Sequence, residues 1–173
     1  MTSRIFKLIV LALLMVPNTL RAQKSQMTSL IKQSLDKLQA PSRQNILNCV
    51  AELKRIDAMF PDSVPPKYNI ALQSLSYAIQ YPADKQTEDM MKEAEESINK
   101  MEKMKGADLS DIYTFRGFYY MVRIVQNPAM NGARYYRDVI EFYQKALSIN
   151  PNNTLAKQLR QQFQEGMKQA MKR

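Results

Sequence analysis

The sequence predicts an all-α fold: an antiparallel stack of helix hairpins with about seven helices. Apolar residues recur at intervals of three and four, which is the spacing of a buried helix face, and no stretch alternates as a half-buried strand does. Only four of the 173 residues are Gly. Pro and Asn stand between the periodic segments, where they end one helix and begin the next.

The first 22 residues predict a secretory signal peptide. Arg4 and Lys7 form a short positive region, and residues 8–16 are an uninterrupted apolar run. This run is shorter than the roughly 20 residues that a membrane-spanning helix needs, and Ala22 suits a cleavage site. An uncleaved membrane anchor is the alternative. No Cys follows the run, so we expect no lipid-modified N-terminus. We predict a periplasmic or secreted location and one domain over 23–173.

Three helices are predicted in the first half of that domain. Pro41 ends the first helix, and Ser42 can cap the second. Pro65 and Pro66 suit the first turn of the third, where Pro is tolerated. Their apolar faces carry Met27, Leu30, Ile31 and Leu38, then Ile46, Val50, Leu53 and Ile56, then Tyr68, Leu72, Leu75 and Ile79.

Four further helices are predicted in the second half. The fourth begins near Asp84, has its acids early and its lysines late as the helix dipole favours, and Gly106 is placed to end it. Asp108 can cap the fifth. The Asn, Pro and Gly of residues 126–133 predict a loop before the sixth. The four apolar faces carry Met91, Ala94, Ile98 and Met101; Tyr113, Gly117 and Tyr120; Tyr136, Ile140, Tyr143 and Leu147; and Leu155, Leu159, Phe163 and Met167.

Residues 143–153, YQKALSINPNN, contain the most informative local pattern. A helix there carries an aromatic residue, then a small one, and stops at Pro151. Asn152 or Asn153 can cap the next helix. This pattern resembles the end of a tetratricopeptide repeat.

Two earlier helices are similar to the first helix of that repeat, in which an aromatic residue is followed by a small or apolar one and another large one. The resemblance implies that Gly117 lets two helices approach closely. Tyr68 and Tyr113, the matching aromatics, are 45 residues apart, against about 34 in the family. A longer fourth helix fits the extra residues. The loop before the sixth helix, longer than the usual turn inside a repeat, is a second departure from the family. The resemblance covers roughly Ser42 to Gln164 and implies a TPR-like α-solenoid.

Such repeats bind proteins or peptides on a concave surface lined by their first helices. The resemblance therefore implies a non-catalytic binding module of the bacterial envelope with a protein or peptide partner. Its groove would be lined by Asn69, Gln73, Tyr77, Thr114, Phe118 and Met121. The alternative is a structural subunit of an envelope assembly that docks through its C-terminal helix. The sequence gives neither the partner nor the oligomeric state.

The composition argues against catalysis. The chain has no His, which excludes Ser-His-Asp and Cys-His arrangements and most zinc sites. No two Gly lie close enough for a phosphate-binding loop. The acids of the fourth helix alternate with lysines, as on a solvated face. We therefore expect no enzyme, no metal and no cofactor.

The net charge and the single cysteine limit the kinds of partner that we expect. Without the three basic residues of the signal peptide, the formal net charge falls from +9 to +6. No basic stripe with interleaved aromatics accompanies it, so we expect no nucleic-acid partner. Cys49 is the single Cys; we expect a buried thiol, with intermolecular pairing as the alternative.

Two local features leave alternatives open. The basic, Gln-rich helix from Thr154 predicts a polar cap on the stack, and an amphipathic helix lying on an anionic membrane is the alternative. Residues 62–64 (Asp-Ser-Val) resemble a short O-glycosylation motif of some exported Gram-negative proteins, and residues 152–154 match the N-linked acceptor pattern. The sequence does not decide whether either is modified.

Overall fold

The structure, a computed structural model, describes residues 21–39 and 42–170 and is helical throughout, with no strand in these ranges. This confirms the predicted all-α stack. The predicted signal peptide falls almost wholly on residues outside the described ranges, as does Pro41. The helices are residues 21–36 with a 3-10 turn at Lys37–Gln39, α2 (Arg43–Met59), α3 (Val64–Gln80), α4 (Thr87–Glu102), α5 (Leu109–Gln126), α6 (Pro128–Ile149) and α7 (Thr154–Ala170).

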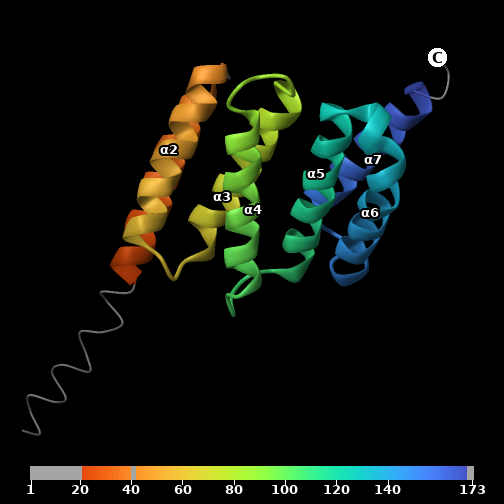
Figure 1. Ribbon diagram of the computed structural model, residues 1–173. Coiled ribbons are helices and arrows are strands. Elements are labelled where there is room, and N and C mark those ends of the chain that lie inside the picture. Colours follow the sequence, from red (N-terminus) through yellow and green to blue (C-terminus); the bar gives the residue numbers. More distant parts are fainter. Residues whose placement is uncertain (1–20, 40–41, 171–173) are drawn as a thin grey trace, which may run out of the picture.

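The helices form antiparallel hairpins that stand side by side in one row (Figure 1). Helix α3 pairs with α4, and α5 pairs with α6. Each following first helix contacts both members of the preceding pair: α5 packs on α3 and α4, and α7 packs on α5 and α6. Helices α3, α5 and α7 therefore share one side of the stack.

Side-chain caps explain where three of the helices begin. The Ser42 hydroxyl accepts from the Asn45 N–H at 3.2 Å, and the Asp108 carboxylate accepts from the Ser110 N–H at 2.7 Å. Both caps were predicted. The seventh helix is capped by Asn153, whose amide oxygen accepts from the Ala156 N–H at 3.0 Å. Such caps satisfy N–H groups that have no partner inside the helix.

The predicted loop at 126–133 is wrong. Helix α6 begins at Pro128, so Asn127 alone separates it from α5. Asn127 ends α5 and at the same time caps α6, because its side chain accepts from the Met130 N–H at 3.1 Å. Asn131 donates its side-chain amide to the Arg123 carbonyl at 2.6 Å, at the end of α5. The same Asn and Pro residues that are typical of loops here form a direct helix-to-helix corner.

Both predicted ends of the fourth helix also need correction. Helix α4 starts at Thr87, three residues after Asp84, and ends at Glu102. Asp84 instead organises the preceding turn, since its carboxylate accepts from the Gln86 N–H at 2.9 Å. Gly106 lies in the turn that follows the helix, and no described Gly has a positive φ. It therefore does not act as a left-handed helix cap.

The core consists of two apolar clusters, and the larger one includes a close contact between α5 and α6. A Cβ built on Gly117 would lie 2.8 Å from Cε1 of Tyr143, closer than real carbon atoms approach. Tyr143 is fully buried there. The predicted close approach at Gly117 is confirmed. Cys49 is buried in a second cluster between α2 and its neighbours, and burial raises the pKa of its thiol to about 11.

Candidate binding surfaces

The structure places four of the six predicted groove residues in the core. Tyr77 and Thr114 are fully buried, and Phe118 and Met121 are 4% and 7% exposed. Asn69 and Gln73 are half-buried on α3. The expectation that all six face an open groove is thus corrected, because a first helix such as α3 or α5 contacts its own partner, at least one preceding helix and the following first helix.

The buried hydroxyl of Tyr77 has a hydrogen-bond partner within the fold. Its hydroxyl donates to the Asp84 carboxylate at 2.8 Å, and that carboxylate also pairs with Arg43 at 3.0 Å. Burial raises the pKa of Tyr77 to about 12, and the Asp84 carboxylate adds to this shift. The pKa of Asp84 is lowered, first by the Gln86 N–H and then by the Tyr77 hydroxyl. Tyr77 therefore ties α3 to the turn before α4.

Thr114 belongs to a buried polar cluster that fixes the start of α7. The Asn153 side chain donates to the Ser110 hydroxyl at 2.9 Å, the Asp111 carboxylate at 3.0 Å and the Thr114 hydroxyl at 3.3 Å. Ser110 donates in turn to the Ala146 carbonyl at 2.8 Å. Burial raises the pKa of Asp111. The cluster joins α5, α6 and α7, and its polar groups are used within the fold.

An apolar pocket of about 520 Å³, which we call the inner pocket, lies where the first helices α3, α5 and α7 meet the start of α6. Its lining consists of Ile79, Met121, Ile124, Val125, Pro128, Gly132, Gln162, Phe163, Gly166, Met167 and Ala170. Met121 is the one predicted groove residue among them. Gln162 is the single polar side chain among these described lining residues, and Val125 is 41% exposed at the pocket.

Sequence reasoning missed most of this pocket. It placed the groove along the middle of the third and fifth helices, whereas the open apolar surface lies at the ends of α3 and α5. One signal was present: Ile124 and Val125 follow one another at the end of an amphipathic helix, so both cannot lie on the same buried stripe. The contribution of α7 depends on how that helix packs and has no local sequence signal.

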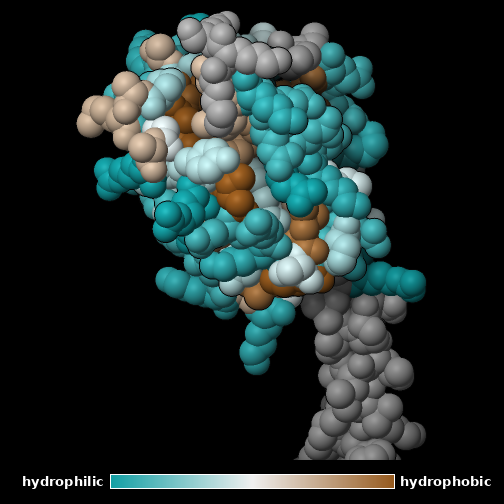
Figure 2. Space-filling view, turned by 90° about the vertical axis from the view of Figure 1, so that its right-hand side faces the viewer, coloured by the Kyte–Doolittle hydropathy of each residue, from teal (hydrophilic) through white to brown (hydrophobic). Residues whose placement is uncertain are grey.

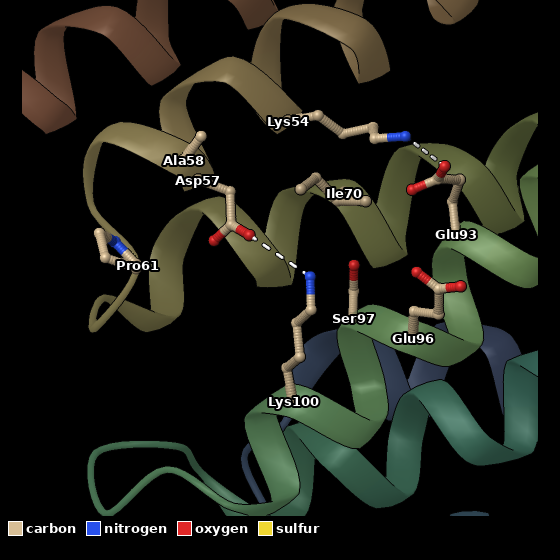
Figure 3. A pocket seen from close by; sticks show the side chains of 9 residues that line it. All are labelled: Lys54, Asp57, Ala58, Pro61, Ile70, Glu93, Glu96, Ser97 and Lys100. Carbon is tan, nitrogen blue, oxygen red and sulfur yellow. Dashed lines mark hydrogen bonds and ion pairs between the residues drawn. The ribbon is translucent and has the colours of Figure 1, made fainter.

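A second pocket, of about 320 Å³, lies between α2 and α4 and is polar (Figure 3). Its charged groups largely pair with one another. Lys54 binds Glu93, and the Asp57 carboxylate contacts both Lys67 at 2.6 Å and Lys100 at 3.8 Å. Lys67 is almost completely buried and also donates to the Pro61 and Ser63 carbonyls. This arrangement holds the turn between α2 and α3.

No group of His, Cys, Asp or Glu in the described part of the chain is arranged to hold a metal ion. Nor does any helix described there have the length and apolar character needed to cross a bilayer.

No protein-family model, curated protein or solved structure matches this chain. The likeness to tetratricopeptide repeats therefore stays a prediction from the residues quoted above.

Proposed function

We propose that this chain is a non-catalytic protein- or peptide-binding module of the bacterial envelope, and that the inner pocket receives apolar side chains of its partner. The observation that supports the proposal is the pocket itself. It is a concave apolar surface of about 520 Å³ on the side shared by the first helices. Its volume lies in the range of roughly 300–1,000 Å³ that is typical of ligand sites.

The lining favours a neutral apolar ligand. Among the residues that the structure describes, no charged side chain lines the inner pocket. A charged group entering it would therefore lose its hydration without gaining a partner among them. Apolar groups gain about 25 cal/mol for each Å² that they remove from water. Met121 and Met167 lie in the lining, and their flexible thioethers can adapt to side chains of different shape. The pocket is large enough for a few side chains and too small for a long peptide.

Placement in the envelope rests on the predicted signal peptide. The exported location and the lack of catalysis both come from the sequence: the apolar run at residues 8–16 and the absence of His. A non-catalytic binding module needs an accessible apolar surface and no reactive group, and the inner pocket provides such a surface.

The neutral dye N-phenyl-1-naphthylamine, which fluoresces in apolar surroundings, tests the pocket directly. We expect saturable fluorescence with residues 23–173, and displacement by short Leu- and Phe-containing peptides but not by their Ser-substituted counterparts. Val125→Asp should weaken dye binding by about tenfold or more, because it places a charge at the apolar lining.

Met59→Asp is the matched control for that variant. Met59 is 55% exposed at the end of α2 and does not line the inner pocket, so this variant should bind the dye as the parent does. Thermal midpoints should show that both variants fold. Equal dye binding by Val125→Asp and the parent, or displacement by both kinds of peptide, would contradict the proposal.

A further inference from the structure

A second apolar surface lies between α6 and α7 and shares Phe163 and Met167 with the inner pocket. A furrow of about 270 Å³, which we call the end-face furrow, runs between α6 and α7 and is lined by Tyr136, Ile140, Phe163, Gln164, Met167 and Lys168. Figure 2 looks at this end of the stack and shows brown apolar surface between teal hydrophilic ridges. Tyr136 is 40% exposed although its ring contacts that of Phe163.

The pattern of helix packing indicates what kind of element fits the furrow. Helices α3 and α5 are each followed by an antiparallel helix that packs along them, α4 and α6 respectively. Within residues 21–39 and 42–170, no helix follows α7 in this way. The furrow lies beside α7, between it and α6, and offers an apolar surface on which a further helix can pack. Amphipathic helices bind such grooves through apolar anchors at positions i, i+3 or i+4, and i+7.

The charges around the furrow indicate the partner's flanks. Arg137 lies three residues before Ile140, and Arg160 lies three before Phe163, so each is on the helix face next to the furrow; Lys168 lines it directly. None of these three cations has an ion pair with a described carboxylate, whereas Arg116 and Arg123 on α5 are paired with Glu102 and Glu88. Together α6 and α7 carry six basic and three acidic side chains.

We propose that the end-face furrow binds an amphipathic helix of a partner protein, with apolar side chains along the furrow and Asp or Glu flanking them opposite Arg137, Arg160 and Lys168. A second copy of this chain fits less well. Two α7 faces would bring like charges together, which disfavours association. The acidic helix α4 has only polar residues at its exposed positions, so it offers no apolar stripe.

This proposal does not depend on ligand binding by the inner pocket. It assigns a partner chemistry to the alternative role that the sequence leaves open, a structural subunit docking through its C-terminal helix. The two surfaces share Phe163 and Met167, so the test uses residues that belong to one surface alone. Tyr136 and Lys168 line only the furrow, and Val125 lines only the inner pocket.

The experiment is a display selection on residues 23–173. The library presents 20-residue helices with Leu fixed at i, i+3, i+4 and i+7 and with random flanking positions. We expect the selected helices to be rich in Asp and Glu at the flanks. Their affinity, measured by fluorescence anisotropy at about 50 mM salt, should fall at least tenfold on Arg137→Glu combined with Lys168→Glu and also on Tyr136→Ala. It should fall as salt rises, because exposed charges are screened.

Val125→Asp should leave these helices bound at parental strength while it weakens dye binding in the inner pocket. Failure of one surface is thereby distinguished from failure of the other. Selected helices without acidic bias, or with affinity insensitive to both furrow variants, would overturn the proposal. So would a dimer of this chain, detected by sedimentation, that is abolished by Tyr136→Ala, because the furrow would then be a self-interface. Binding to anionic vesicles that is lost on the charge reversal, without helix binding, would assign the surface to membranes instead.

Discussion

Substituting Gly117 by Ala tests the close contact between α5 and α6. In an exposed helix the change stabilises, because Gly is about 1 kcal/mol less favourable than Ala in a helix interior. At Gly117 the added Cβ would lie 2.8, 3.0 and 3.1 Å from Cε1, Cδ1 and Cζ of Tyr143. The Tyr143 ring is fully buried, so any movement of the ring away from the new Cβ has to be taken up within the core. Overpacking of this kind costs roughly 1–3 kcal/mol, and we expect a net loss of about 1 kcal/mol.

Gly166→Ala is the matched control. Gly166 lies within α7, and a Cβ built on it meets nothing within 4 Å. This substitution should raise the free energy of unfolding by about 0.5–1 kcal/mol. The two Gly-to-Ala changes are therefore predicted to have opposite signs, and Gly117→Leu should cost more than Gly117→Ala, on the order of 2 kcal/mol or more.

Urea unfolding of residues 23–173, followed by circular dichroism at constant m-value, measures both changes. Two backgrounds locate the clash. Tyr143→Phe keeps the three ring atoms that Cβ would meet, so Gly117→Ala should cost the same there. Tyr143→Leu removes the ring, so the cost should largely disappear as a coupling energy between the two sites. If Gly117→Ala stabilises the protein as Gly166→Ala does, the reasoning about the α5–α6 contact is refuted.

Four further predictions follow from the caps, charges and termini. Asn153→Ala should lower the free energy of unfolding by roughly 1–3 kcal/mol, since it removes a helix cap and leaves buried polar groups unpaired, while Asn152→Ala should change it by less than about 0.5 kcal/mol. The pKa of Asp84 in the folded protein is lowered from 3.8. The ionised carboxylate therefore stabilises the fold above pH 3.8, and this contribution is lost as the pH falls through the folded pKa. The urea midpoint should decline less between pH 6 and 2 in Asp84→Asn than in the parent protein. Cys49, buried with a pKa of about 11, should react with a thiol reagent at pH 8 only as the protein unfolds, so a labelling rate independent of urea would contradict its burial. Exported protein should begin near Gln23 by mass spectrometry; an intact N-terminus in the soluble exported fraction would rule out a cleaved signal peptide.

The sequence by itself determined the helices, several of their ends and the position of one close contact. These features depend on local rules: apolar spacing defines a helix, and Ser42 and Asp108 cap because their side chains reach N–H groups two or three residues away. The close contact at Gly117 was predicted from the resemblance to the first helix of a tetratricopeptide repeat, in which a Gly lets two helices approach closely. Local rules were misleading at 126–133, where Asn127 both ends and begins a helix. The sequence signals for that corner and for a loop are the same.

Only the tertiary structure decided which apolar residues are covered. Helical spacing indicates that Tyr77, Phe118 and Val125 belong to apolar surface, but a first helix in this stack is covered from several sides at once. Tyr77 and Phe118 face neighbouring helices and are buried, whereas Val125 is 41% exposed at the inner pocket. Val125 lies at the end of α5, in a pocket that residues of α3 and α7 also line. Contacts between helices that are distant in the chain determine which of these residues is buried, and the sequence of a single helix does not predict such contacts.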